Sequence, residues 1–459
     1  MIFSSKAKEE FNVKAVISPK MDEFVNMCGR IYAGKPDWVD PENHIKTINF
    51  AKAICEETAK LTTLGISIKI DGSARATWLQ EQIDAVYYKL RTWVEYGCAY
   101  GTIALKPNGN SIDLVKPDSF MVTDVSNGKI VGIVFYNHEV SNDGETFYTR
   151  LEYHRFINNE TYVITNKCYA GESQQDLGKP IAIENTPWSH LKEEVSINGL
   201  KTPLYAVLTM PKANNIDIES PLGLPQFSEA IEELKDLDVA YSRNAKEIYD
   251  SKRTVLMDSD KLIIPRGQNA LSTDTWERAK DAMKLPDYVR NVMGNGSEDY
   301  YQEINPTLNT DVRMNGINAL LSQIGFKCGF SNGYFVFNEK TGMVTATQVE
   351  SDDRRTLQTI KDIRDALESC LTDLISAMDE FASLYGLAPL GTYECTFDFG
   401  DLTYSREEDR QRWWQYVQAG KVPAWMYFVK FEGLTEDEAK AMTQEADAGN
   451  SENPLFGAE

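Results

Sequence analysis

Residues 329–360 read GFSNGYFVFNEKTGMVTATQVESDDRRTLQTI, and this segment joins two kinds of structure. Its first part holds three residues that favour turns, Gly329, Asn332 and Gly333, before a short apolar run. Its second part opens a helix that meets no Gly or Pro before Gly386. At 1.5 Å per residue, we predict a rod roughly 60 Å long with a small apolar hairpin at its beginning.

The rod carries one narrow seam of apolar residues. The run TATQVE at 345–350 contains two overlapping capping boxes, which place the start of the helix there. Near-heptad spacing along the seam predicts packing against partners along one line. The seam consists of Leu357, Ile360, Leu367, Leu371, Leu374, Met378, Phe381 and Tyr385, with Arg364 at one core position.

Two more helices are predicted before the rod, at 226–251 and 311–325. A helix with a thin apolar stripe needs neighbours along one line, because its own domain cannot surround it. The first stripe is Phe227, Ile231, Leu234, Tyr241, Ala245 and Ile248, interrupted by Asp238, and the second is Ile317, Leu320, Leu321 and Ile324.

An insert at 254–308 separates these two helices. It begins with the strand-like runs TVLMD and KLIIP, and a helix is expected at WERAKDAM, after Asp274. The two helices are therefore expected to form a hairpin that carries a small domain at its tip.

The N-terminal half predicts an α+β domain. Helices are expected at 43–64 and 76–96, the second with Gly97 at its C-cap. Three runs rich in Val, Ile, Tyr and Phe predict an antiparallel meander, at 129–140, 145–156 and 161–170.

The C-terminal part is predicted as a strand followed by short helices. The strand is TYECTFDFG at 392–400, and the helices begin at Ser405 and Thr435, each with a Glu three residues on. Beyond Asp447 the composition is typical of a disordered tail.

Overall composition limits the class of protein. The chain has 459 residues, 42% of them hydrophobic, and a net charge of −22, so it is globular and long enough for about two to four domains. The acidic excess argues against a protein that coats DNA through its phosphates. We expect no signal peptide and no membrane helix. Seven scattered cysteines without a CxxC indicate free thiols in a reducing compartment.

No catalytic signature is found in the sequence. A P-loop, a GxGxxG after a strand, an HExxH and a GxSxG are all missing. Asp398-Phe399-Gly400 matches the kinase DFG, but the glycine-rich loop and HRD that should accompany it do not occur. With 69 Asp and Glu, spacing alone selects no acid–base pair. We therefore expect no enzyme activity, no cofactor and no metal site.

Three pairs of side chains allow two interpretations each. His138 and His154 could face each other across the meander, but two separate strand-surface histidines are favoured. Trp413-Trp414 could stack on bases or sugars, but packing between helices or subunits is favoured, because adjacent helical residues point in different directions. Arg354-Arg355 could meet phosphate, but a local charge pair with the two preceding aspartates is favoured.

This order of elements resembles the portal proteins of tailed bacteriophages, particularly those of phages and prophages of Gram-positive bacteria. The resemblance covers about residues 20–445. The matching text is SPLGLPQFSEAIEELKDLDVAYSRNAKEIYDSKRTVLMDSDKL at 220–262, the opening segment extended to residue 363, YGCAYGTIAL at 96–105, KPDSF at 116–120 and NGKIVGIVFY at 127–136.

The resemblance implies a portal fold of the α+β class, with a division into named parts. These are an α/β wing at 1–224, stem helices at 225–253 and 309–327, a small α/β clip at 254–308, a tunnel loop, long wing helix and strand at 328–404, a helical crown at 405–447 and a tail at 448–459.

The resemblance also implies a function and partners. Portals are rings, usually dodecamers, at one vertex of the capsid in the virion, and are made in the cytoplasm of the bacterial host. Such a ring is the channel for packaging and ejection of double-stranded DNA, without sequence recognition, and is part of the head–tail connector. Implied partners are further copies of the chain, the terminase large subunit, the head-completion adaptor and the major capsid and scaffolding proteins, with no membrane.

Two sets of residues follow from the resemblance. The tunnel loop would bring Asn338, Lys340, Thr341, Met343 and Val344 toward the DNA. The subunit–subunit seam would contain Leu234, Tyr241, Ile248, Leu320, Ile324, Leu367 and Leu371.

Two other classes of protein stay open. One is a monomeric hydrolase that acts on a polymer through a carboxylate pair. The other is a capsid assembly scaffold without a channel. The portal hypothesis requires that residues 345–385 are not surrounded on every side by their own chain.

Overall fold

The structure is a computed structural model that describes most of the chain. The chain forms two compact units. The first unit comprises residues 1–63 and 69–395, and the second comprises 64–68 and 396–459. Helices and antiparallel sheets make the fold α+β, as predicted. The described residues are 2–108, 111–142, 144–158, 161–173, 176–251, 254–258, 289–292, 301–304, 308–337, 346–400, 406–419, 421–432, 434–436 and 438–443.

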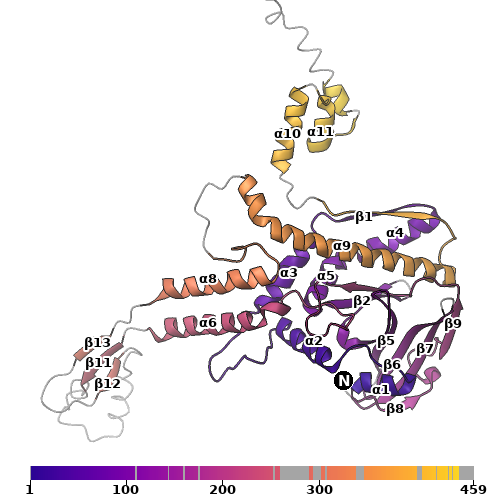
Figure 1. The fold of residues 1–459 in the computed structure, drawn as a ribbon, viewed down its shortest axis with the longest axis horizontal. Coiled ribbons are helices and arrows are strands. Elements are labelled where there is room, and N and C mark those ends of the chain that lie inside the picture. Colours follow the sequence, from indigo (N-terminus) through magenta and orange to yellow (C-terminus); the bar gives the residue numbers. More distant parts are fainter. Residues whose placement is uncertain are drawn as a thin grey trace, which may run out of the picture. The chain divides into compact units, whose positions relative to one another are not determined.

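Five helices occur in the N-terminal part of the first unit (Figure 1). The sequence did not predict the first two, and the helix expected at 43–64 begins only at residue 50. The five are α1 (Ile2–Phe11), α2 (Pro19–Tyr32), α3 (Phe50–Thr62), α4 (Ala74–Val86) and α5 (Leu90–Tyr100).

The predicted helix at 76–96 is two helices, α4 and α5, joined by the 3₁₀ turn Tyr87–Lys89. The stripe that predicted it is buried, including Leu79 and Trp93. Gly97 is not the C-cap, because α5 continues to Tyr100 and ends at Gly101, which has a φ of +79°. Gly97 instead lies within α5 against Met210 and Leu208, where there is little room for a side chain.

Two antiparallel sheets follow these helices. The smaller has the order β10-β2-β3, and the larger has the order β4-β5-β6-β7-β8 with β9 also paired to β7. The predicted meander is confirmed as β5, β6 and β7. The strands are β2 (Thr102–Asn108), β3 (Ser111–Val115), β4 (Phe120–Ser126), β5 (Lys129–Val140), β6 (Phe147–Asn158), β7 (Thr161–Gly171), β8 (Lys179–Ile181), β9 (Glu194–Asn198) and β10 (Ala206–Thr209).

The register of the meander separates the two histidines. His154 pairs with Ile133, whereas His138 pairs with Thr149, so the two do not face each other. The interpretation of His154 as a strand-surface residue is wrong, because it is 2% exposed. Two apolar clusters join the meander to the rest of the unit. One of these clusters includes Ala7 of α1.

Two antiparallel helices, α6 (Ile231–Asp250) and α8 (Thr310–Lys327), lie side by side as the sequence predicts (Figure 1). Between them in the chain is a three-stranded sheet, β12-β11-β13, made of Thr254–Asp258, Val289–Val292 and Tyr301–Ile304. The run TVLMD is thus confirmed as a strand. The run KLIIP and the helix expected at WERAKDAM lie outside the described residues.

The rod predicted from the opening segment is α9 (Ala346–Tyr385), a helix of 40 residues. It begins one residue after the first predicted cap. Within the first unit, α9 packs on α3, α4, β2 and β10. The strand β14 (Tyr393–Asp398) follows and pairs with β1 (Ser67–Gly72).

The second unit contains α10 (Arg406–Gln418) and α11 (Ala424–Glu432), the latter not predicted. Trp413 packs against Phe431, and Trp414 against Tyr427, which confirms packing between helices for the tryptophan pair. The capping box at Thr435 forms, since the Thr435 amide donates to Glu438 Oε2 at 3.0 Å and the Glu438 amide donates to Thr435 Oγ1 at 3.4 Å. The predicted disordered tail lies outside the described residues.

We predict opposite effects for two glycine-to-alanine substitutions. At Gly101 a Cβ would lie 2.2 Å from the Gly223 carbonyl oxygen, at a positive φ, so Gly101→Ala should destabilise the protein by roughly 3 kcal/mol. Gly316 lies within α8 with nothing near its Cα, so Gly316→Ala should stabilise by up to about 1 kcal/mol. Thermal unfolding midpoints measure both effects. Equal midpoints for the two variants would show that the close approach at Gly101 has been misassigned.

Candidate functional site: the helix pair and the loop anchor

Two ion pairs fix the register of α6 against α8. Lys327 Nζ lies 2.5 Å from Glu233 Oε1, and Arg313 pairs with Glu247. Glu233 and Glu247 are 14 residues apart, as are Arg313 and Lys327 (247 − 233 = 327 − 313), so both pairs obey one antiparallel register. That separation spans about 21 Å of helix. We call these two helices the arm.

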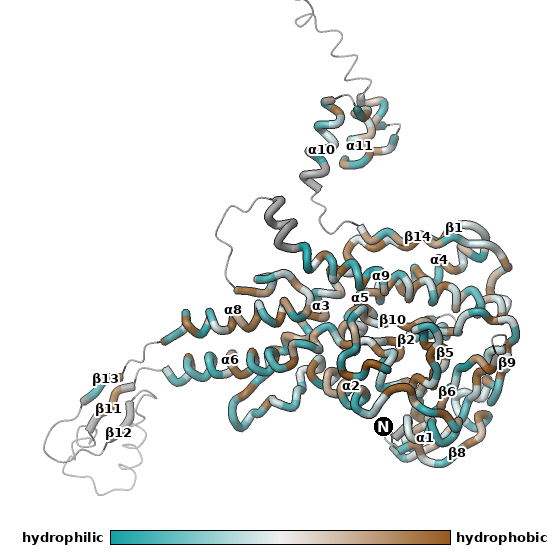
Figure 2. Tube along the Cα trace, in the orientation of Figure 1, coloured by the Kyte–Doolittle hydropathy of each residue, from teal (hydrophilic) through white to brown (hydrophobic). Residues whose placement is uncertain are grey.

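The two halves of the arm differ in what they bury. The half nearer the sheets has an apolar interior that includes Leu234, Leu237 and Leu321. In the outer half, residues 243–250 of α6 and 310–316 of α8 include no buried residue. Figure 2 shows hydrophobic and hydrophilic residues alternating along both helices out to this end.

Large apolar side chains in the outer half face away from the chain's own core. Ile248 is 52% exposed and Val312 is 73% exposed, and Tyr241, just before this half, is also exposed. Two helices alone bury too little apolar surface to be stable, since helix stability in proteins comes mainly from packing of an apolar face. The outer arm therefore has the surface of a structure that is completed by neighbours.

The base of the arm is held by buried polar side chains. Gln226 Nε2 donates to the Cys328 carbonyl oxygen at 2.5 Å, just beyond the end of α8. Lys212 Nζ donates to the Gln226 carbonyl oxygen at 2.9 Å and also approaches the Lys327 carbonyl oxygen. A cation at the C-terminal end of a helix is favourable, because the free carbonyls there carry partial negative charge.

Asp238 does not interrupt the stripe of α6; it fastens another segment to it. Its carboxylate is 3% exposed and accepts hydrogen bonds from Trp38 Nε1 and from the Ile48 amide, each at 2.9 Å. Ser242, one turn on, bonds both backbone groups of Lys46. These bonds hold residues 45–48 on α6, and this explains why α3 starts later than the sequence predicts.

The segment after α8 is anchored to the first turns of α9. The Ser331 amide donates to Thr356 Oγ1 at 2.8 Å, and the two hydroxyls lie 2.9 Å apart. Thr359 Oγ1 donates to the Gly329 carbonyl oxygen at 2.8 Å. Gly329 has a φ of +87°, and a Cβ there would lie 2.5 Å from Thr359 Oγ1, so the turn needs glycine at this position.

Aromatic packing completes this anchor. Phe335 meets Phe330, Tyr334 and Phe50 with ring centroids 4.7 to 5.2 Å apart. The Tyr334 hydroxyl donates to Glu57 Oε1 of α3 at 2.7 Å. We call residues 329–337 the loop anchor. The loop anchor fixes the position of the chain up to residue 337. Helix α9 begins at residue 346.

Arg355 contacts the end of α8. Its guanidinium stacks on the Phe326 ring at 3.9 Å and donates to the Phe326 carbonyl oxygen at 2.9 Å. The charge pair expected with Asp352 and Asp353 stays a prediction, because the side chains of these two aspartates lie outside the described ones. The end of α8 is thus joined to the body and to α9 by cationic side chains from both sides.

Two buried arginines fix α9 on the body of the first unit. Arg364, which the sequence places in the apolar seam, donates to the Thr62 and Leu61 carbonyl oxygens at the end of α3. Arg75 of α4 is 1% exposed and donates at 2.9 Å to the Asp379, Ala388 and Pro389 carbonyl oxygens. Asp379 lies six residues before the end of α9, and Ala388 and Pro389 follow that end.

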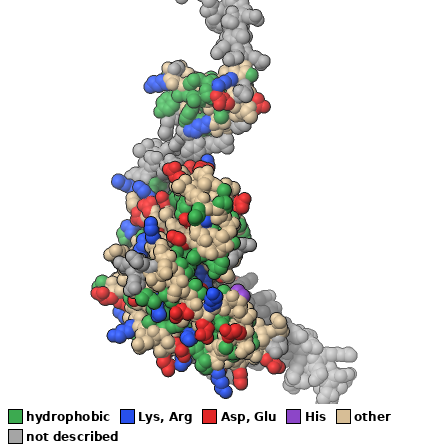
Figure 3. Space-filling view, turned by 90° about the vertical axis from the view of Figure 1, so that its right-hand side faces the viewer, with side chains coloured by type: hydrophobic (Ala, Val, Ile, Leu, Met, Phe, Trp, Pro, Cys, Tyr) green, Lys and Arg blue, Asp and Glu red, His purple; other side chains and the backbone are tan. Residues whose placement is uncertain are grey.

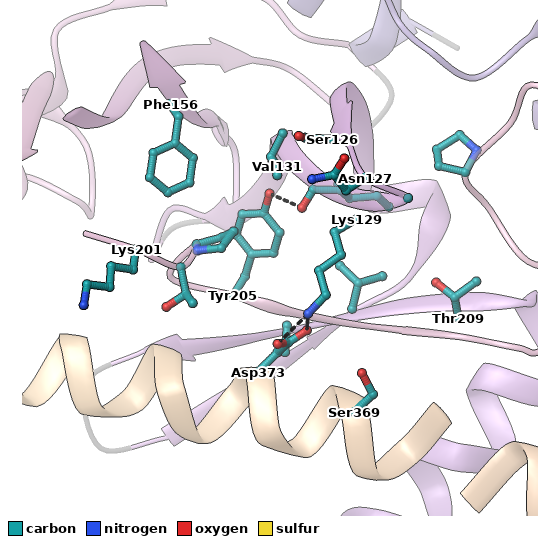
Figure 4. Close-up of a pocket in the computed structure, with 17 residues that line it drawn as sticks. Ser126, Asn127, Lys129, Val131, Phe156, Lys201, Tyr205, Thr209, Ser369 and Asp373 are labelled. Atoms are coloured by element: carbon teal, nitrogen blue, oxygen red, sulfur yellow. Dashed lines mark hydrogen bonds and ion pairs between the residues drawn. The ribbon is translucent and has the colours of Figure 1, made fainter. Parts of the chain in front are cut away.

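A further link crosses a cavity of about 600 Å³ below α9. Lys129 Nζ lies 2.9 Å from both carboxylate oxygens of Asp373, and Tyr205 bonds the Ile130 carbonyl oxygen on the other wall (Figure 4). The opposite side of α9 includes exposed residues from Arg354 to Ser383. The helix is thus covered on one side and not surrounded by its own chain.

The predicted site residues divide into three groups. Asn338, Lys340, Thr341, Met343 and Val344 lie outside the described residues. Within the predicted seam, Tyr241 and Ile248 are exposed and Leu320 is half-buried. The chain's own fold buries Leu234, Ile324, Leu367 and Leu371. Sequence reasoning missed Arg75, Lys212 and Gln226, because nothing in their local sequence indicates the distant carbonyls that they bond.

The described part of the chain contains no group of three or more His, Cys, Asp or Glu side chains that could hold a metal ion. None of its helices combines the length and the hydropathy needed to cross a bilayer. Figure 3 shows acidic and basic side chains interspersed over the face that it draws.

No family model matches the chain, and no curated protein matches it. Among solved structures, a chain of the virion of a native gene transfer agent particle is 13% identical with a TM-score of 0.44, covering 90% of this chain and 93% of that one. A chain from the neck of an empty particle, computed with C6 symmetry, is 12% identical with a TM-score of 0.42, covering 90% and 94%. A chain from the neck of a native particle, computed with C12 symmetry, is 12% identical with a TM-score of 0.43, covering 91% and 95%. At scores and identities this low, the likeness carries no conclusion about this chain.

We predict that Thr356→Val loosens the loop anchor. The substitution leaves the buried Ser331 amide without a partner and its hydroxyl with only the long bond from the Thr356 amide, and an unpaired buried polar group costs about 1–3 kcal/mol. Amide hydrogen exchange over residues 329–337 should become faster. Thr372→Val on the exposed side of α9 is the matched control and should change nothing there. Unchanged amide exchange in Thr356→Val would show that the hydroxyl pair of Ser331 and Thr356 does not hold the anchor in place.

Proposed function

We propose that this chain is the subunit of a phage-type portal, a ring through which double-stranded DNA passes during packaging and ejection. The observation that carries the proposal is the outer half of the arm, which exposes apolar side chains and has no residue in the buried class. In a ring, each arm would lie between two identical arms, and the exposed faces would cover each other. In a closed ring every copy has its exposed faces covered in the same way, whereas an open pair would leave one face of each copy uncovered.

The loop anchor supports a constriction at the axis. Residues 338–345 connect Phe337, whose amide donates to Asn318 Oδ1 at 3.1 Å, to the first residue of α9, Ala346. A short connection between two fixed ends can approach a passing duplex at a defined distance. We propose that Asn338, Lys340, Thr341, Met343 and Val344 form this constriction and touch DNA without reading its bases.

The charge of the chain fits a conduit better than a binder. Each subunit has a net charge of −22, and a ring multiplies this excess. Because affinity for DNA comes mostly from cations that neutralise phosphates, an acidic ring would let a duplex slide without holding it. We infer a non-catalytic role, so the energy for DNA movement would come from a separate motor.

We also propose that the parts of this chain correspond to the wing, stem, clip and crown of a portal. The α/β body up to residue 224 is the wing, the arm is the stem, and the sheet β11–β13 belongs to the clip. We propose that the clip binds the terminase large subunit and later the head-completion adaptor. The wing and the helical crown would face the capsid, its scaffold and the packaged DNA, at one vertex of the virion.

Assembly should depend on the exposed arm residues. We predict that Ile248→Glu, alone or with Tyr241→Glu, prevents formation of the large assembly, because a carboxylate would be buried between neighbouring arms. Sedimentation velocity should show a slow species of single-chain mass in place of a fast species near the mass of a ring.

Ile157→Glu is the matched control, since Ile157 of β6 is 56% exposed and Ile248 is 52% exposed. This variant should assemble as the wild type does. If Ile248→Glu also assembles normally, the arm is not the inter-subunit contact. If wild-type protein sediments only as a monomer with hydrolase activity, the portal proposal is replaced by the polymer hydrolase.

A further inference from the structure

A buried cluster of charges lies between β2, β5 and β6, away from the arm and from α9. Lys106 Nζ is 2.5 Å from Glu152 Oε2, and Arg150 Nη2 is 3.0 Å from the same oxygen. Asn137 Nδ2 also donates to Oε2, and His154 Nε2 lies 2.9 Å from Oε1. The carboxylate of Glu152 is therefore fully occupied by four partners.

The ionisation of these groups follows from their surroundings. Burial alone would raise the pKa of Glu152, but Lys106, His154 and Arg150 outweigh it and hold that pKa well below the usual range. Burial lowers the pKa of His154, against the opposing hydrogen bond to Glu152. At neutral pH the cluster thus contains two cations, one carboxylate and a neutral imidazole, which leaves one positive charge uncompensated.

Arg150 holds that uncompensated positive charge at the wall of a cavity. Its side chain is 9% exposed, and its guanidinium stacks over the Trp188 ring at 5.2 Å. Of its five N–H donors, only two reach acceptors among the described residues, Glu152 Oε2 and Asn166 Oδ1, and Nε is buried without any. A buried charge is costly unless its donors are hydrogen-bonded, and three donors of Arg150 have no acceptor among the described residues.

A cavity of about 540 Å³ borders Arg150. Its rim has two cations, Lys89 and Lys116, and two carboxylates, Asp113 and Glu139, so the rim is balanced and the surplus charge lies at Arg150. Trp93, Ile112, Leu114 and Trp188 supply apolar surface beside it. The volume is in the range of small-molecule sites, and the lining is mixed, with somewhat more polar than apolar surface.

We propose that this cavity binds a small molecule that carries a phosphate or carboxylate group, and that the acid group pairs with Arg150. A guanidinium recognises both groups through the same paired N–H geometry. The apolar lining then contacts the rest of the ligand. This site is independent of ring assembly, because its residues all belong to the body of one subunit and none to the arm.

Isothermal titration of the full-length protein with inorganic phosphate and with acetate, at matched ionic strength and with chloride as blank, tests the proposal. We expect saturable binding of at least one of the two, and the stronger one identifies the acid group. Arg150→Lys keeps the charge but loses the paired geometry, and should weaken binding about tenfold. Lys116→Ala at the rim, which leaves the buried cluster intact, should weaken it by a smaller factor.

Lys201→Ala is the matched control, since Lys201 borders the separate cavity below α9 and its loss changes the net charge by the same amount as Lys116→Ala. It should bind as the wild type does. The proposal is overturned if neither anion gives more heat than chloride, or if Lys201→Ala weakens binding as much as Lys116→Ala. Both outcomes can be read whether or not the protein forms rings.

Discussion

The attachment of α9 to the body is the constraint on which the rest of this structure depends. Arg364 near its middle and Arg75 at its end bond backbone carbonyls that no apolar residue could satisfy. These contacts leave one side of a 40-residue helix uncovered and set the position of its first turns. Thr356 and Thr359 of α9 then determine where the loop anchor lies, and Arg355 of α9 bonds the end of α8.

The arm and the loop anchor are therefore one connected structure. The end of α8 meets Lys212 and Gln226 on the body side and Arg355 on the side of α9. A displacement of the arm relative to the body would have to break hydrogen bonds at this junction or move α9 with it. In the proposed ring, the same junction would place the segment 338–345 of every copy at the same distance from the axis.

The long helices and the meander could be predicted from the sequence because each repeats its apolar pattern over many residues. The rod, the two arm helices and the three-stranded meander each have a periodicity that extends over many residues, and the structure confirms all of them. The division between α4 and α5 was missed, because the apolar stripe continues in phase across Tyr87–Lys89. Helix α3 starts late because Asp238, almost 190 residues away, takes the Ile48 amide, and no local pattern records such a bond. The same holds for Arg75 and Gln226, whereas Arg364 could be noticed as a charge within an apolar seam.

The central claim is that many copies of this chain surround one axis. Images of the purified, assembled protein by electron microscopy, viewed end-on, test it most directly. The account predicts closed rings of one rotational symmetry with a central hole wide enough for a DNA duplex. Compact particles without a hole, or open filaments, would contradict it.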